Sequence, residues 1–268
     1  MTTLTHRRLS RHVLNRLIDE APTEPVSLTD DHRRSLSARF RAVASSDHRR
    51  LDAWMVERAG QPYDAFRWSP VTARRSIGNA ALRRMVDDPT LTEFAAVDIE
   101  VTDQLLRAAA GYARGGSLSQ WLASSTPSVV ALVSAEAANW TTQLAEAAEG
   151  IFLPWSVASS DAYYDVARAR TTLRGRRDLV VANGLSRVVL RVRAGAPGKS
   201  AGPGLRADLT IDALAEPSGL AASRVLGLWP EAGVVLSVDA TMDDLRSGAR
   251  DLVRTAVAWQ RHRLRNAA

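Results

Sequence analysis

The sequence predicts an α/β protein with a helical N-terminal region and a C-terminal core built around a small sheet. Apolar residues recur at helical spacing through most of the first 150 positions. The first clear strand signal is residues 163–193, where three short runs rich in β-branched residues are separated by turn residues. The pattern after these runs predicts helix, strand and helix. We therefore expect a helical region over residues 1–125 and an α/β core over residues 126–268.

The N-terminal part of the sequence predicts three amphipathic helices. Residues 4–19 carry apolar side chains at intervals of four, and residues 31–59 also place apolar side chains on one side. The run Gly60-Gln61-Pro62 then ends the second helix. A third helix is expected from Ser69-Pro70, because serine caps a helix well and proline suits the first helical position.

The middle of the chain predicts three further helices, at residues 102–114, 118–123 and 127–149. The last of these has the clearest pattern, with a stripe of apolar residues at helical period: Val133, Ala137, Trp140, Leu144 and Ala148. Glu136 borders this stripe, so we expect its carboxylate near the buried face of the helix.

Residues 163–172, 174–181 and 186–193 predict a three-strand meander. The pair Asn183-Gly184 separates the last two strands and is the strongest short-range signal for a hairpin. We therefore expect these three strands to lie side by side in one sheet.

The remainder predicts loop, helix, strand and helix. Residues 195–204 predict a loop, and an interrupted helix is expected from Arg206 to about Leu226. Residues 233–239 predict a buried strand, and Thr241 caps the last helix. Three arginines form a ridge beside the apolar stripe of that helix: Arg246, Arg250 and Arg254.

The run Gly195–Ser200 ends in Gly-Lys-Ser, as a phosphate-binding loop does. That motif requires its first glycine at the position that Arg193 occupies here. The following residues, Ala201-Gly202-Pro203-Gly204, also argue against a helix that starts directly after the loop. We predict an ordinary loop and no nucleotide site.

Composition limits the possible sites and partners. The chain of 268 residues has no cysteine, which excludes disulfides and thiolate metal ligands. No apolar run is long enough to cross a bilayer, and the basic N-terminus lacks the apolar segment of a secretory signal. We therefore expect a cytoplasmic protein without a membrane partner.

The charge distribution is compatible with nucleic acid as a partner. The formal net charge is +6, with +7 in residues 1–84, −7 in residues 85–160 and +6 in residues 161–268. Basic surfaces bind phosphate, and arginine is the better bidentate partner for it. Only one of the 35 basic residues is a lysine, however, and this bias also indicates a GC-rich genome.

The sequence does not contain the common catalytic patterns. None of the five histidines has the spacing of a zinc ligand, and no nucleophile elbow occurs. The acid pairs Asp87-Asp88 and Asp243-Asp244 lie at predicted helix ends, where helix capping explains them better than catalysis.

The phrase Leu173-Arg174-Gly175-Arg176-Arg177-Asp178-Leu179 and the following strand Arg187–Gly195 resemble the PD-(D/E)XK nuclease superfamily, in particular its RecB-type branch. The resemblance covers the C-terminal half and implies a restriction-endonuclease-like core. In that family an aspartate and a second acid hold a divalent metal, a lysine orients the attacking water, and an upstream helical glutamate completes the site. The resemblance implies that Asp178 is the aspartate and that Glu136 is the helical glutamate.

The sequence departs from the family at the acid and lysine positions, which are Arg191 and Arg193 here. Residues two apart on a strand point to the same face. Two guanidinium groups would repel a divalent cation, and arginine is too basic to shuttle a proton. We therefore expect no metal cofactor. We also expect Asp178 to form an ion pair with Arg191, Arg193 or Arg176.

The leading prediction is a non-catalytic nuclease-fold protein that binds nucleic acid or a protein partner in DNA metabolism. Its candidate nucleic-acid contacts are six arginines of the predicted sheet: Arg168, Arg170, Arg174, Arg176, Arg191 and Arg193. One alternative is an active magnesium-dependent nuclease that uses Asp178, Glu136 and a displaced acid such as Asp165. A second alternative is a protein-interaction module whose helical half binds through Trp54, Trp68 and Trp121.

Overall fold

A computed structural model of the chain describes residues 5–43, 49–57, 68–113, 115–148, 156–157, 161–166, 170–183, 186–193 and 195–267. The chain divides into two compact units, one formed by Met1–Tyr63 with Ser159–Ala268, and the other by Asp64–Ala158. The first unit therefore combines both ends of the chain. This division differs from the one predicted between residues 125 and 126, because N-terminal strands pair with strands from the C-terminal part.

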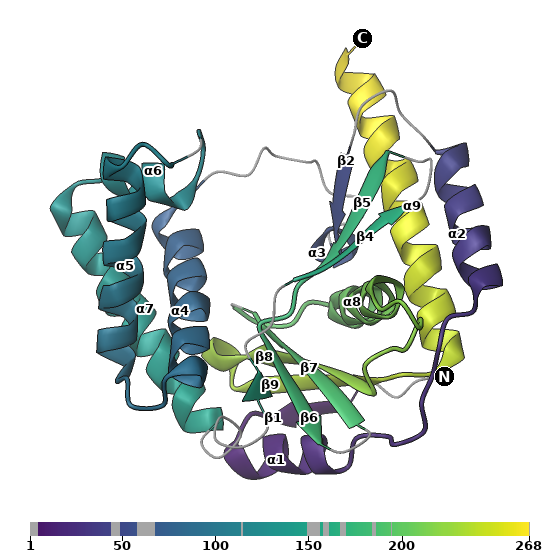
Figure 1. The fold of residues 1–268 in the computed structure, drawn as a ribbon, viewed down its shortest axis with the longest axis horizontal. Helices are drawn as coiled ribbons and strands as arrows, with labels where there is room; N and C mark the ends of the chain where they lie inside the picture. The colour runs from purple at the N-terminus through teal and green to yellow at the C-terminus, as the bar shows by residue number, and fades with distance from the viewer. Residues whose placement is uncertain are drawn as a thin grey trace. The chain divides into compact units, whose positions relative to one another are not determined.

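The first unit holds two sheets and the helices packed on them (Figure 1). Its elements are β1 (Thr5–Arg8), α1 (Arg11–Asp19), α2 (Asp30–Ala42), β2 (Arg49–Asp52), α3 (Trp54–Glu57), β4 (Ala162–Val166), β5 (Thr171–Gly175), β6 (Leu179–Asn183), β7 (Ser186–Val192), α8 (Ala201–Ala215), β8 (Arg224–Trp229), η1 (Pro230–Ala232), β9 (Val234–Asp239) and α9 (Met242–Ala267). Within this unit the larger sheet has the order β1-β9-β8-β7-β6, and the smaller sheet has the order β2-β5-β4.

Both sheets are mixed. In the larger sheet β7 and β8 are parallel, whereas β1, β8 and β6 are each antiparallel to a neighbour. In the smaller sheet β2 runs parallel and β4 antiparallel to the central β5. The parallel pair β7–β8 is joined through helix α8, as a parallel connection requires. The predicted α/β class is therefore confirmed.

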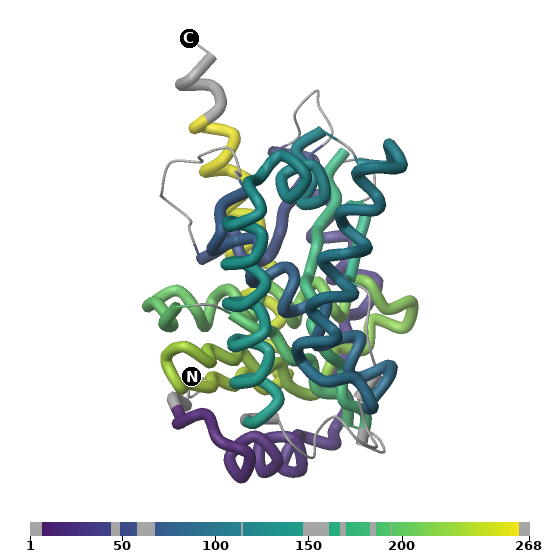
Figure 2. The backbone as a smooth tube through the Cα atoms, turned by 90° about the vertical axis from the view of Figure 1, so that its left-hand side faces the viewer, coloured from purple at the N-terminus to yellow at the C-terminus, as the bar shows by residue number. Residues whose placement is uncertain are grey.

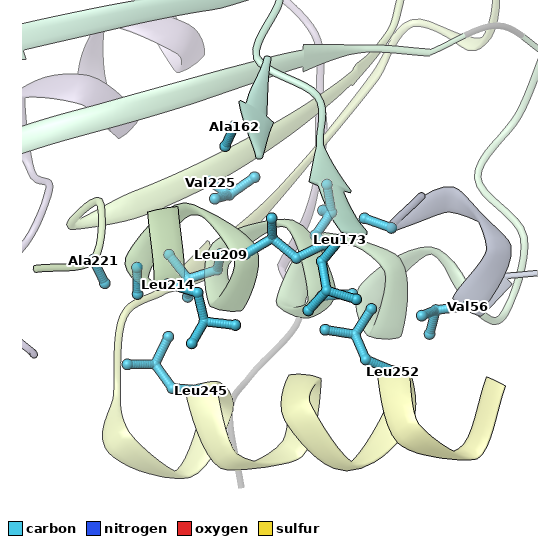
Figure 3. Packing of buried hydrophobic residues seen from close by; sticks show 14 of the residues in the cluster. Val56, Ala162, Leu173, Leu209, Leu214, Ala221, Val225, Leu245 and Leu252 are labelled. Carbon is cyan, nitrogen blue, oxygen red and sulfur yellow. The ribbon is translucent and has the colours of Figure 1, made fainter. Parts of the chain in front are cut away.

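Helix α8 is the central element of the first unit. Of its 15 residues, 12 are buried, and it packs against α9, α3 and strands of both sheets. Figure 3 shows Leu209 and Leu214 of this helix among side chains from β5, β8 and α9: Leu173, Val225 and Leu245. Burial of a leucine side chain contributes about 1.5–3 kcal/mol. Both sheets therefore depend on one helix for their shared core.

The second unit is helical. It contains α4 (Pro70–Asp87), α5 (Glu93–Ala109), α6 (Leu118–Ser124), α7 (Pro127–Ala148) and the short strand β3 (Ser156–Val157). Helices α4, α5 and α7 lie side by side (Figure 1, Figure 2). The predicted start of α4 is confirmed, because the Ser69 side chain accepts from the Thr72 N–H in a capping box. Among the residues that the structure describes, no helix is long and apolar enough to span a membrane.

The helices predicted over residues 4–19 and 31–59 are wrong in part. The first begins as strand β1, which pairs with β9, and becomes helical only from Arg11. The second ends at Ala42, and Arg49–Asp52 forms strand β2 beside β5. Local periodicity did not indicate these strands because their pairing partners lie far away along the chain, and tertiary pairing overrides weak local preference.

The prediction of one three-strand meander is also wrong. Strands β4 and β5 form a hairpin in the smaller sheet, whereas β6 and β7 form a hairpin in the larger sheet. The run predicted as one strand over residues 174–181 is broken between Gly175 and Leu179, where the chain passes from one sheet to the other. The hairpin expected near Asn183 is confirmed, since Asn183 pairs with Ser186.

Two predictions after the sheet need correction. Helix α8 begins at Ala201 rather than Arg206, since glycine and proline are tolerated in a first turn whose N–H groups have no helical partner. The segment predicted to be helical up to Leu226 contains strand β8. All six residues of this strand are buried, which shows that both of its faces are covered. The predicted single strand after α8 is therefore an antiparallel pair, β8 and β9.

Candidate functional site

Three carboxylates follow one another along the central helix and its C-cap at Asp208, Asp212 and Glu216. Residues four apart lie on the same side of a helix, so these carboxylates share one face of α8. This face meets arginines of strand β7 and of the link Arg176–Asp178, which joins the two sheets. The result is a buried network of ion pairs between α8 and the larger sheet.

Asp178 and Arg191 lie at the centre of this network. Asp178 is fully buried, and its Oδ1 accepts from Arg176 Nε at 2.9 Å while its Oδ2 accepts from the Val192 N–H at 2.8 Å. Arg191 Nε lies 3.9 Å from Asp178 Oδ2, and Arg191 Nη1 donates to Asp208 Oδ2. Asp208 is 2% exposed and Arg191 is 3% exposed. One guanidinium therefore lies between two buried carboxylates. Asp178 pairs with Arg176 and lies near Arg191, which are two of the three partners that the sequence predicted.

Burial has a clear effect on the acid–base properties of Arg191. Loss of solvation and, to a smaller extent, the nearby charge of Arg193 lower the pKa of its guanidinium to about 9, and Asp178 opposes the change. The resulting pKa is still above neutral. Arg191 is therefore a cation at neutral pH and balances the carboxylates beside it.

Arg193 has a different partner, on helix α3. Its Nη2 donates to Glu57 Oε2, and its guanidinium lies 5.9 Å from the ring centroid of Trp229. Glu57 is packed against the first turn of α8, since a Cβ at Gly204 would come within 2.1 Å of Glu57 Oε1. Burial raises the pKa of Glu57, against the opposite influence of Arg193 and Arg191.

Asp212 forms a second group of contacts, one turn farther along α8. Its Oδ1 lies 2.6 Å from Arg177 Nη2, and its Oδ2 accepts from Arg187 Nη2 at 2.7 Å and from the Ala222 N–H at 2.8 Å. Glu216 Oε1 accepts from the same two arginines at 3.2 and 2.8 Å. Burial raises the pKa of Asp212, and the two arginines oppose that change. These contacts fix the C-terminal half of α8 to the larger sheet.

No family model, curated protein or solved structure matches this chain.

The residues of the network do not fit a divalent metal. Magnesium requires several anionic or carbonyl oxygens around one point. Asp178 and Asp208 already share the guanidinium of Arg191, which occupies the space between them. Within the described parts of the chain, no group of three or more histidines and acids is arranged to hold a metal ion.

The other acids named for the nuclease alternative have partners close to their own positions. Glu136 belongs to α7 in the second unit, where its Oε2 accepts from Arg74 Nη1 at 3.1 Å. Asp165 lies on β4 in the smaller sheet, and its Oδ1 accepts from Thr172 Oγ1 at 2.5 Å. Each of these carboxylates therefore has a local partner of its own.

Most of the arginines proposed as nucleic-acid contacts have carboxylate partners within the chain. Arg174 donates to Asp161 Oδ2 at 2.8 and 2.5 Å and lies 3.6 Å from Asp52. Arg170 lies at the turn before β5 with a φ of 46° and is exposed. Arg168 lies outside the described residues. With the contacts given above for Arg176, Arg191 and Arg193, four of the six arginines are neutralised by acids of the protein itself.

The three tryptophans of the interaction-module alternative are half-buried. Trp54 Nε1 donates to Asp52 Oδ2 at 3.3 Å, and Trp68 Nε1 donates to the Gly116 carbonyl at 2.8 Å. Trp121 packs against the core of the second unit. These side chains therefore support the fold at their own positions.

The loop before α8 also has an internal partner. The Gly195 N–H donates to Glu231 Oε2 at 2.6 Å, so a carboxylate lies where a phosphate-binding loop would bind an anion. A helix does begin directly after Ser200, contrary to expectation. The side chain of Lys199 is exposed to solvent. The contact with Glu231 argues independently for the predicted ordinary loop.

Sequence reasoning missed the roles of Glu57 and Asp208. The spacing of Asp208, Asp212 and Glu216 indicates a shared acidic face on α8, and this signal was available in the sequence. Glu57 has no comparable signal, because its partner Arg193 lies 136 positions away.

Proposed function

We propose that this chain is a non-catalytic protein with a nuclease-like α/β core that binds nucleic acid as part of DNA metabolism. The observation that supports this proposal is the position of Arg191 between Asp178 and Asp208. In a metal-dependent nuclease the corresponding space belongs to a divalent cation. Here an arginine side chain supplies the positive charge.

The charge balance of the buried network argues against a catalytic metal. Asp178 and Asp208 are matched by Arg176 and Arg191. A divalent cation would have to displace a guanidinium that is covalently part of the protein and buried with it. It would also meet two positive charges at close range. The network therefore acts as a structural joint between β7, α8 and the link between the sheets.

The proposed binding of nucleic acid depends on arginines that are not part of the buried ion-pair network. The first unit carries a net charge of +9, with +3 in residues 1–63 and +6 in residues 159–268. Because the buried acids compensate the buried arginines, much of this positive charge belongs to exposed side chains. A positively charged exterior attracts polyanions and releases their counterions on binding.

The test combines a cleavage assay with a binding assay on the full chain. Labelled single-stranded and double-stranded DNA and RNA are incubated with the protein and either Mg²⁺ or Mn²⁺, and binding is followed by fluorescence anisotropy at increasing salt. We expect intact nucleic acid and binding that weakens linearly on a log–log plot as salt rises.

Two results would overturn this proposal. Metal-dependent cleavage that is lost in Asp178→Ala and kept in the exposed control Asp98→Ala would establish an active nuclease. Failure of the folded protein to bind any of these nucleic acids at low salt would remove the binding function.

A further inference from the structure

The outer face of α9 carries a row of exposed arginines, which we call the arginine ridge: Arg246, Arg250, Arg254 and Arg261. With 3.6 residues per turn, these four positions fall within a sector of about 80°. Successive members of the first three are about 6 Å apart along the helix axis. The side chains of Arg246 and Arg254 are 55% and 74% exposed, so the ridge is open to solvent.

The opposite face of α9 is fixed to the core. Leu245 and Leu252 are fully buried and point toward α8 (Figure 3). The two helices approach closely at Gly248, where a Cβ would come within 2.2 Å of Thr210 Oγ1 and 2.4 Å of the Arg206 carbonyl oxygen. The ridge is therefore held on a rigid element, and its arginines keep their spacing when a ligand binds.

The charge of this helix is positive overall. Helix α9 contains six arginines and three acids, which are Asp243, Asp244 and Asp251. The helix therefore carries a net charge of +3.

The ion pairs along the ridge are local, and their arginine side chains are exposed. Arg246 lies 3.8 Å from Asp243, whose side chain is 92% exposed, and Arg254 lies 3.2 Å from Asp251. Exposed pairs one turn apart on a helix contribute little, because water and salt screen them. A phosphate group can therefore compete for these guanidinium groups, which it could not do for a buried arginine.

We propose that the arginine ridge is the surface that binds the phosphodiester backbone of nucleic acid. This inference rests on the function proposed above and assigns that function to one helix face. Arginine binds phosphate oxygens in a bidentate manner, and a row of them follows a chain of phosphates. Because backbone contacts carry no base information, we expect binding that is largely independent of sequence.

The test compares two variants that remove equal charge from two exposed helix faces. The first is Arg246→Gln with Arg250→Gln and Arg254→Gln. The control is Arg34→Gln with Arg39→Gln and Arg41→Gln on α2, where all three arginines are exposed. Binding of the full chain to labelled DNA is measured by anisotropy between about 50 and 200 mM salt. Circular dichroism confirms that both variants are folded.

We expect the ridge variant to bind at least about tenfold more weakly, and its salt slope to fall by about 0.9 for each lost phosphate contact. The α2 control should keep most of the salt dependence that the wild type shows. Equal losses in both variants, or no loss in the ridge variant, would overturn the assignment while the proposed binding function stood. Binding by the wild type to phosphatidylserine vesicles but not to DNA would overturn both.

Discussion

Arg191 on β7 donates to Asp208 on α8, and both side chains are buried in the first unit. The same guanidinium lies beside Asp178, which directly precedes β6, so one arginine joins strand β7, the link between the sheets and the central helix. A buried ion pair of this kind is costly to form because both charges lose their hydration. Its main consequence is that neither partner can be removed alone without leaving a buried charge.

Arg191→Ala should therefore destabilise the protein strongly. The change leaves Asp208 without its charged donor and weakens the compensation of Asp178, for which we expect a loss of about 3–5 kcal/mol in the free energy of unfolding. Urea unfolding followed by circular dichroism measures this loss. Arg254→Ala is the control, because its side chain is 74% exposed and its ion pair with Asp251, one turn away on the same helix, should contribute less than about 1 kcal/mol. Similar effects of both substitutions would show that the buried network has no special role.

Arg191→Glu should convert the network into a cation site. The substitution places a third carboxylate beside Asp178 and Asp208, which is the donor set that hard divalent cations prefer. We expect Mn²⁺ to raise the thermal midpoint of this variant, or to fold it where it is unfolded without metal, because binding to the folded state stabilises it. The thermal midpoints of the wild type and of Arg191→Gln should not change when Mn²⁺ is added. A variant whose unfolding is unaffected by Mn²⁺ would contradict the proposed geometry.

Glu57 should make stability fall as pH rises above about 4.5. Burial raises its folded-state pKa above the ordinary value of 4.5, so the folded protein keeps this proton longer than the unfolded chain. As pH rises from 4.5 through the raised pKa, the unfolded state loses its proton first, and the free energy of unfolding falls. The slope from this one group cannot exceed about 1.4 kcal/mol per pH unit.

Glu57→Gln isolates this contribution, because all other groups titrate in both proteins. The free energy of unfolding of the variant minus that of the wild type should increase with pH from about pH 4.5 upward. Urea unfolding at a series of pH values measures the difference. A difference that stays constant across this range would show that Glu57 has the same pKa in both states.

Features set by neighbouring residues could be predicted from the sequence. The start of α4 depends on Ser69 and Pro70, and the cap of α9 depends on Thr241, whose side chain accepts from the Asp244 N–H at 3.1 Å. The ion pair of Asp178 with Arg176 is equally local, since the two residues are two positions apart. In each case the physical cause lies within one turn or one short strand.

The remaining features depend on contacts between distant parts of the chain. Strand β1 is a short, charged segment that becomes a strand only beside β9, where His6 pairs with Leu236. The break at Arg176–Asp178, which separates the two sheets, is stabilised by carboxylates of α8, for example by Asp208 bonding to the Arg176 N–H at 3.2 Å. No local pattern encodes such partners, so the sequence suggested one sheet where the structure has two.

Gly78→Ala should destabilise the second unit, although alanine is the better helix former by about 1 kcal/mol. A Cβ at Gly78 would lie 2.5 Å from Trp140 Cε3, and the Trp140 ring is buried between α4 and α7. Overpacking of this kind costs about 1–3 kcal/mol, so the clash should outweigh the gain in propensity. Gly115→Ala is the control, because nothing lies within 4 Å of its added Cβ. Urea unfolding should show a loss for Gly78→Ala only, and combining it with Trp140→Leu should recover part of that loss. A Gly78→Ala protein as stable as the control would show that α4 and α7 are not in close contact at this point.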